Sequence, residues 1–285
     1  MADIPVTVNV PYLMFSSPST DSFLSEASGG EHTDLKFSFR TVQKLPELKD
    51  IRHEEPRRIY VGEGDAAGTF FRSHPGREPY AFVSRRTVKD GFLFCDYLSG
   101  SERFMNYARN LITLLDLETT MLEFDTMILH ASLIRWMGRG IVFSAPSGTG
   151  KSTQASLWER YAGAEVLNGD RAAIRKKDGF PRAYGIPYAG TSGIYRNESA
   201  PLTALVALRQ AGENRIRRIH GAEAFRYLYR ETMIHRWDPV FEDRAVKLLM
   251  DVISEVPVFL LECRPDSGAV ETLKTEILSL VHEDP

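Results

Sequence analysis

The segment Ala145–Ser152, which reads Ala-Pro-Ser-Gly-Thr-Gly-Lys-Ser, combines glycines, a lysine and hydroxyl side chains at the spacing of a phosphate-binding loop. It follows the apolar run 141–144 and precedes a helical pattern, and a helix N-terminus attracts anions through its free N–H groups and its dipole. Gly148 and Gly150 let the backbone bend around phosphate oxygens because they lack a Cβ atom. The residues expected to bind a nucleotide are Ser147, Gly148, Thr149, Gly150, Lys151, Ser152 and Thr153.

Lys151 and Ser152 have distinct expected tasks within this loop. The ammonium of Lys151 can meet the β- and γ-phosphates, and the hydroxyl of Ser152 can bind Mg²⁺. Ala145 stands where the pattern G-x-x-x-x-G-K-[ST] has its first glycine, but the flanking strand and helix patterns still favour nucleotide binding. The alternative for Thr153 is an ordinary place in the first helical turn.

Two further polar residues belong to the strands on either side of the loop. Asp170 ends the next predicted strand, eighteen residues after Ser152. His130 lies in the preceding strand, twenty-one residues before Lys151. A carboxylate in this place can hold Mg²⁺ or accept a proton from a hydroxyl group. The alternatives are a turn-capping aspartate and a core histidine, and for the histidine the residue pattern alone favours the core.

These parts resemble the HPr kinase/phosphorylase and PEP carboxykinase superfamily. The resemblance rests on three segments, His130-Ala131-Ser132, Ser147–Thr153 and Gly169-Asp170. It covers about residues 127–275 and includes the segments 185–190, 200–202 and 256–266. It is greatest to the HPr-kinase-like serine kinases found in modified-peptide gene clusters.

The resemblance implies a fold, cofactors and roles. The fold would be α/β, with a P-loop core like that of PEP carboxykinase and the C-terminal domain of HPr kinase, a mixed sheet with flanking helices. The cofactors would be ATP and Mg²⁺. Lys151 would hold phosphates, and Ser152 with Asp170 would hold the metal. His130 would lie near the transferring phosphoryl group or assist the metal, so Asp170, His130 and Lys151 are the expected catalytic residues.

Gly169 departs from the pattern of that family. HPr kinases carry a pair of aspartates at this point, one acting as base toward the substrate serine and the other serving the metal. This chain reads Gly169-Asp170. Either Asp170 does both jobs, or the base comes from elsewhere, or the chain has lost much of its activity.

The chain is expected to divide near residue 100 into a β-rich N-terminal lobe (1–100) and the HPr-kinase-like P-loop domain (101–285). Alternating apolar runs favour antiparallel strands in the lobe, at 35–39, 58–61, 69–72, 80–83 and 92–95. The segment 16–30 reads as loop. One helix is expected between Glu102 and Met127, because apolar residues recur there at helical spacing without Gly or Pro.

Composition and charge limit the partners and the cellular compartment that are expected for this chain. A hydrophobic fraction of 43% and a net charge of -3 are ordinary globular values and point to neither nucleic acid nor a membrane. Cys95 and Cys263 fit neither a metal nor a redox spacing, which indicates a reducing compartment. Because no signal segment and no membrane-length apolar run is present, the expected location is cytoplasmic.

Ten basic residues between Arg171 and Arg218 favour a solvated face, with a surface for phosphates or an acidic partner as the alternative. Arg196 and Arg209 are likewise expected on the surface, the alternative being a place near the transferring phosphate. His235, Trp237 and Tyr229 are expected to pack a helix that spans 222–235, and Trp158 is expected in the core.

The first functional hypothesis is an ATP-dependent kinase that transfers the γ-phosphoryl group to a serine or threonine hydroxyl of a peptide or small protein. A small-molecule kinase or a PEP-carboxykinase-like enzyme is the alternative within enzymes. An alternative of another class is a non-catalytic nucleotide-binding regulatory or peptide-binding protein, which Gly169 favours. Family resemblance also suggests a homo-oligomer.

Overall fold

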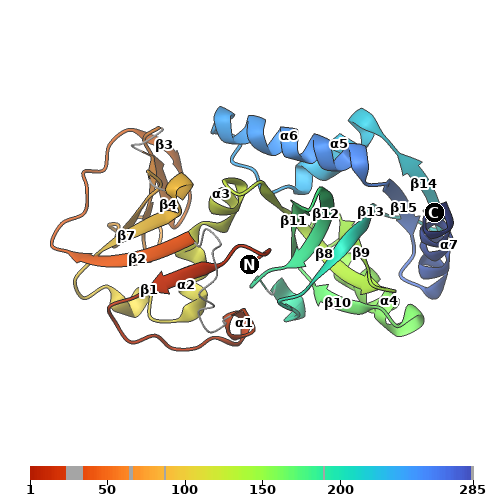
Figure 1. Ribbon diagram of the computed structural model, residues 1–285, viewed down its shortest axis with the longest axis horizontal. Helices are drawn as coiled ribbons and strands as arrows, with labels where there is room; N and C mark the ends of the chain where they lie inside the picture. The colour runs from red at the N-terminus through yellow and green to blue at the C-terminus, as the bar shows by residue number, and fades with distance from the viewer. Residues whose placement is uncertain (24–34, 64–66, 87, 189, 284–285) are drawn as a thin grey trace. The chain divides into compact units, whose positions relative to one another are not determined.

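The computed structural model describes residues 1–23, 35–63, 67–86, 88–188 and 190–283. The chain forms two compact units (Figure 1). The first holds Met1, Asp3–Phe124 and the segment His235–Pro239, and the second holds Ala2, Asp125–Ile234 and the chain from Val240 onward. The division therefore follows Phe124, whereas the sequence pattern placed it near residue 100.

The first unit is built on a seven-stranded sheet with the order β1-β2-β7-β6-β5-β4-β3. The strands are β1 (Val6–Asn9), β2 (Leu35–Val42), β3 (Ile51–Glu54), β4 (Arg58–Val61), β5 (Gly68–Phe71), β6 (Ala81–Ser84) and β7 (Phe92–Leu98). The five predicted strands are present, and β1 and β3 are additional. The antiparallel prediction is wrong for β2 and β7, which pair in parallel, and the additional strand β1 also pairs in parallel with β2. Parallel neighbours need a long crossover, and here the four intervening strands connect β2 to β7.

Helices α1 (Pro18–Asp21), α2 (Ala108–Leu115) and α3 (Leu117–Leu122) complete the first unit. The single helix expected before Met127 is wrong, because Asp116 separates α2 from α3 with a φ of 47°. Its carboxylate is buried and forms ion pairs with Arg58, at 3.1 Å, and with Arg85. The expected loop at 16–30 contains α1, and its residues 24–30 lie outside the described part of the chain.

The second unit contains an eight-stranded mixed sheet with the order β10-β8-β11-β12-β13-β15-β14. Its strands are β8 (Thr126–Trp136), β9 (Arg139–Ser144), β10 (Glu165–Asn168), β11 (Arg171–Lys177), β12 (Phe180–Gly185), β13 (Ser199–Gln210), β14 (Arg215–Ile219) and β15 (Val258–Cys263). Strand β9 pairs in parallel with β13 and antiparallel with β8. The β11–β12 hairpin is confirmed, and β14 is an addition within the basic stretch.

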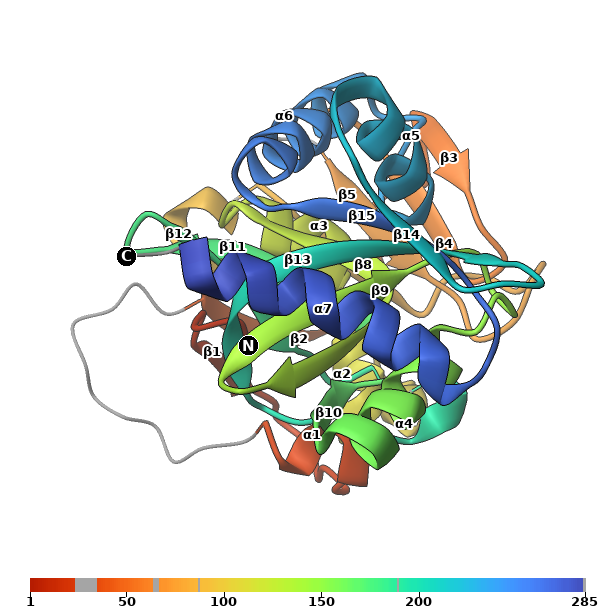
Figure 2. The same cartoon turned by 90° about the vertical axis from the view of Figure 1, so that its right-hand side faces the viewer.

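Helices cover both faces of this sheet (Figure 2). Helices α4 (Lys151–Ala162) and α7 (Ser267–Glu283) pack on one face around Trp158, which is fully buried as predicted. Helices α5 (Gly221–Glu231) and α6 (Pro239–Glu255) pack on the other face, where Leu228 and Leu249 are fully buried. The unit is thus α/β, a mixed sheet between two layers of helices, as expected from the sequence. None of the helices described is long and apolar enough to cross a bilayer.

Candidate functional site

The predicted phosphate loop connects the end of β9 at Ser144 to the start of α4 at Lys151. Gly148 has a φ of 79° and Gly150 a φ of 114°, a region that glycine enters without a steric penalty. Thr149 N donates to Pro146 O at 3.2 Å and closes a tight turn within the loop. The first N–H groups of a helix have no acceptor within the helix, so those of α4 are available to an anion held by this loop.

Lys151 lies under the loop and is 6% exposed. Its ammonium donates to the carbonyl oxygens of Ala145, at 2.6 Å, and Pro146, at 3.3 Å. Burial lowers the pKa of Lys151, and the charges of Glu231 and Asp170 partly oppose this shift. The cation is therefore pre-positioned at the loop between its carbonyl oxygens and two carboxylates.

The peptide carbonyl of Gly169 joins three parts of the site. It accepts hydrogen bonds from Ser152 Oγ, at 3.2 Å, and from Ser132 Oγ, at 3.0 Å. Ser132 belongs to β8, and Ser152 to the first turn of α4. These two hydrogen bonds therefore attach the turn between β10 and β11 to helix α4 and to strand β8.

Asn168 orients Asp170 in the same turn. Its Oδ1 accepts from the backbone N–H of Asp170, at 2.9 Å, and of Arg171, at 3.0 Å. Asn168 is fully buried, and its amide nitrogen donates to the carbonyl oxygens of Ile186, at 2.8 Å, and Tyr188, at 3.1 Å. This side chain gave no functional signal in the sequence, since a buried asparagine at a strand end is common in turns. It anchors both the Asp170 turn and the glycine-rich segment after β12.

His130 lies between two carboxylates. Its Nδ1 is 3.1 Å from Glu231 Oε2, and its Nε2 is 4.0 Å from Asp170 Oδ1. The His130 side chain is 28% exposed, so the residue is not the core histidine favoured by the residue pattern alone. The structure brings His130, Asp170 and the loop together, since Ser144 Oγ also donates to the carbonyl oxygen of His130 at 3.4 Å.

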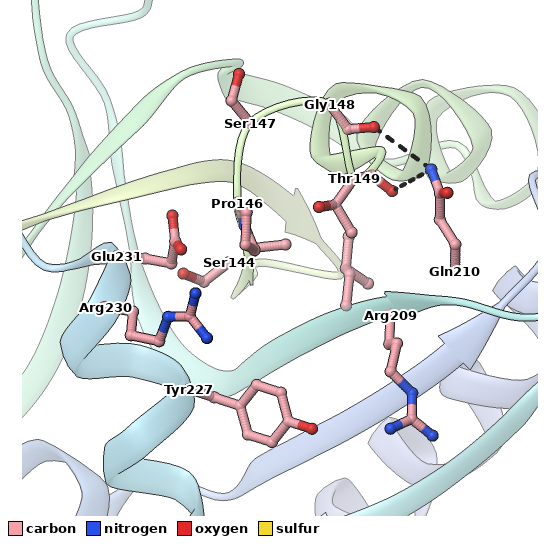
Figure 3. Close-up of a pocket in the computed structure, with 12 residues that line it drawn as sticks. Ser144, Pro146, Ser147, Gly148, Thr149, Arg209, Gln210, Tyr227, Arg230 and Glu231 are labelled. Carbon is pink, nitrogen blue, oxygen red and sulfur yellow. Dashed lines mark hydrogen bonds between the residues drawn. The ribbon is translucent and has the colours of Figure 1, made fainter.

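A cavity of about 540 Å³ opens beside the loop (Figure 3). The side chains of Tyr227, Arg230 and Glu231 project from α5 toward it. Gln210 at the end of β13 donates to the carbonyl oxygens of Gly148, at 3.4 Å, and Thr149, at 3.3 Å. The remaining lining residues are Ser144, Ala145, Pro146, Ser147, Leu208 and Arg209.

Sequence reasoning missed Gln210 and the residues of α5. Tyr227, Arg230 and Glu231 are spaced so that they share one helix face, and this polar face was the available signal. Thr153 lies exposed in the first turn of α4. His235 is not part of the predicted helix, because α5 ends at Glu231 and His235 belongs to the first unit.

At least six of the ten basic residues in the basic stretch contact acidic side chains, among them Arg171, which lies 3.5 Å from Asp170. These pairs agree with the interpretation of the stretch as a solvated face. Arg209 pairs with Glu262, and Arg196 lies 3.9 Å from Glu198. Further pairs are Lys176–Glu255, Arg215–Glu213 and Arg217–Glu223. Arg209 still lines the cavity, although it contacts Glu262.

The donor set at the loop suits a magnesium ion that is shared with phosphates. Within the described ranges, no group of three or more His, Cys, Asp or Glu residues is placed to hold a metal alone. Ser152 and Asp170 offer a hydroxyl and a carboxylate oxygen, and Mg²⁺ is commonly bound through one or two protein ligands plus substrate phosphates and water. The residues present therefore fit the ion.

Comparison with known proteins finds similarity at the level of distant solved structures. The sequence matches no protein-family model and no curated protein. Among solved structures it is similar to the Hpr(Ser) kinase/phosphatase from Coxiella burnetii, with a TM-score of 0.33 and 10% identity. The match covers 54% of this chain and 98% of that chain. A likeness of this level carries no argument about activity.

Proposed function

We propose that this chain is an ATP-dependent kinase that transfers the γ-phosphoryl group to a serine or threonine hydroxyl of a peptide or small protein. The observation that carries the proposal is the junction of β9, the loop and α4. Gly148 and Gly150 both have positive φ, and the ammonium of Lys151 lies directly under the turn. Together they provide backbone donors and a cation at one point, which is the arrangement that cradles nucleotide phosphates.

The other residues receive roles in keeping with the family resemblance. The backbone of 147–153 would bind the phosphates, in a core of the HPr-kinase and PEP-carboxykinase type. Ser152 and Asp170 would hold Mg²⁺, which when bound neutralises charge on the phosphates. Because Asp170 and His130 lie 4.0 Å apart, an acceptor hydroxyl near the loop could reach either side chain.

A second candidate function, a nucleotide-binding regulatory protein without turnover, is favoured by the surroundings of Gly169. A Cβ atom added to Gly169 would lie 2.0 Å from Ser192 Oγ and 2.6 Å from Ser192 Cβ. Ser192 therefore occupies the space that a second aspartate would need. If both carboxylates of the family pattern are required for transfer, the chain would bind ATP and do no chemistry.

The two functions differ in acceptor-dependent turnover. The protein is incubated with ATP, Mg²⁺ and a library of serine- and threonine-containing peptides, and ADP formation is followed beside mass spectrometry of the peptides. The kinase proposal predicts ADP formation that requires a peptide, with one phosphoryl group added to it. Lys177→Ala, at the far end of β11, serves as the control that keeps activity, whereas Lys151→Ala removes it. ATP binding without acceptor-dependent ADP would support the regulatory function instead.

A further inference from the structure

Glu231 and His130 form a pair that is built into the second unit. Glu231 is the last residue of α5, and its side chain is 10% exposed. Immediately after it, the chain bonds directly to β8: Met233 N donates to Ile128 O at 2.9 Å. Thr232 forms an isolated bridge with Leu129, the residue before His130. The two residues after Glu231 therefore pair with the two residues before His130, and this pairing sets the 3.1 Å contact between Glu231 Oε2 and His130 Nδ1.

We propose that Glu231 is a positioning residue that fixes the tautomer of His130, and that Nε2 of His130 accepts the proton of the acceptor hydroxyl. This inference rests on the proposed kinase function. An ionised carboxylate can only accept a hydrogen bond, so Nδ1 of a neutral His130 carries the hydrogen. The lone pair is then on Nε2, which is the division of roles that a carboxylate imposes on a catalytic imidazole.

The free side of the ring faces the turn that holds Asp170. The 4.0 Å between Nε2 and Asp170 Oδ1 is longer than a hydrogen bond, so this contact does not occupy the lone pair. Asp170 itself lies 3.5 Å from Arg171 Nε, and its carboxylate is the proposed ligand of the metal. Metal binding and proton acceptance, the two tasks of an aspartate pair, are thus divided between Asp170 and the His130–Glu231 pair. Gly169 stands in place of the second aspartate and lies against Ser192.

The transfer step is balanced with these groups alone. The hydroxyl proton moves to Nε2 as the hydroxyl oxygen forms its bond to the γ-phosphorus. The bond from that phosphorus to the oxygen bridging the β-phosphate breaks, and its electron pair leaves with ADP. The imidazolium carries a positive charge between Glu231 and Asp170 until it returns the proton to solvent. Glu231 also lines the cavity beside the loop (Figure 3).

The kinetic test compares Glu231→Gln and His130→Asn with Glu223→Gln. Glu223 lies on the same helix but forms a surface ion pair with Arg217, so its substitution is the matched control. Glu231→Gln and His130→Asn should lower kcat about 100-fold or more, the usual contribution of a general base. Glu231→Ala should recover part of its kcat when formate is added. A lower melting temperature with normal kcat of the folded fraction would show a purely structural pair and overturn the proposal.

A spectroscopic test is independent of turnover. Nitrogen-15 NMR of the imidazoles in the histidine-labelled full chain reports the tautomer of each of the seven histidines, and His130→Asn assigns the relevant signal. The native protein should show His130 protonated at Nδ1, and Glu231→Gln should shift it toward the Nε2–H form. An Nε2–H tautomer in the native protein would overturn the proposal even if the chain is a kinase. A protein that shows the expected tautomer but no transfer activity would retain Glu231 as the residue that positions the ring. It would contradict both the kinase function and the role of His130 as a base.

Discussion

Ser152 Oγ donates a hydrogen bond to the carbonyl oxygen of Gly169, 3.2 Å away. This bond ties the first turn of the loop helix to the turn that presents Asp170, the next residue. The same carbonyl accepts from Ser132 Oγ on β8 at 3.0 Å, and Ser132 lies 37 residues from Gly169 along the chain. The two proposed magnesium ligands are therefore positioned against each other by a single peptide group rather than by a flexible connection.

Asp170→Asn should abolish phosphoryl transfer, because the amide carries no charge to Mg²⁺. The Asp170 side chain is 31% exposed, so the fold should lose no more than about 1 kcal/mol from its ion pairs. ATP binding measured without metal should be unchanged, since Lys151 and the loop backbone are untouched. Kinetics and metal-free titration of the same sample check both statements. Full transfer activity in a well-folded Asp170→Asn protein would place the metal elsewhere.

Gly169→Ala should destabilise the protein by about 1–3 kcal/mol, the usual effect of overpacking. The backbone is not the obstacle, because φ of Gly169 is outside the positive range that disfavours side chains. The obstacle is Ser192, whose Oγ would lie 2.0 Å from the new Cβ. Adding Ser192→Gly should restore much of the lost stability in urea unfolding. If the double variant is no more stable than Gly169→Ala, the packing explanation is wrong.

Because Ser192→Gly removes the steric contact with a side chain at position 169, the same background allows a test of the restored aspartate pair. Gly169→Asp in the Ser192→Gly background should fold. It should not raise transfer activity if His130 already supplies the base. A large gain in activity would instead indicate a chain that lost its base together with the second aspartate.

The tight turn between Ser144 and Lys151 could be predicted from sequence because its geometry is local. Gly148, Gly150 and Lys151 act through a turn of a few residues, and neighbouring residues alone dictate it. Asp170 and His130 required the family resemblance, since the residue pattern favoured a core histidine. Glu231 could not be found in this way: it lies 101 residues from His130 along the chain, and only the path of α5 against β8 brings them together.

In the first unit, too, the features that depend on long-range contacts could not be predicted from the sequence. The strands were predictable from alternation, but the parallel pairing of β2 with β7 depends on how four other strands return between them. Asp116 breaks the expected helix because Arg58 and Arg85, from β4 and from the end of β6, hold its carboxylate. Such long-range ion pairs leave no signal in a helical periodicity.

The His235 cluster in the first unit predicts a pH dependence of stability. His235 is buried, with Nε2 2.8 Å from Thr119 Oγ1 and 4.0 Å from Asp116 Oδ1. Burial lowers the pKa of His235 from 6.5 to about 4, with Asp116 opposing the shift and Arg85 and Arg58 adding to it. Between these two values the unfolded chain binds a proton that the native unit does not. Stability should therefore rise with pH across this window, by about 3 kcal/mol in total.

His235→Gln should flatten that rise. Urea unfolding followed by tryptophan fluorescence is suitable, because the indole of Trp237 lies 5.3 Å from the His235 ring. Asp116 titrates outside this window. Burial alone would raise the pKa of Asp116, but Arg85 and Arg58 lower it overall. Its contribution to stability is therefore lost only at more acidic pH. An unchanged slope between pH 4 and 6.5 in His235→Gln would show that another group titrates.

The most direct test of the account is calorimetric titration of ATP into the native protein, Lys151→Ala, Lys151→Arg and the control Lys177→Ala. Lys151 is the buried cation under the loop, and the planar guanidinium of arginine cannot replace its compact charge. Both Lys151 variants should lose ATP affinity, and Lys151→Ala by about 100-fold or more, the effect of removing a buried charged partner, while Lys177→Ala binds like the native protein. Equal ATP affinity in all four folded proteins would contradict the assignment of this loop as the nucleotide site.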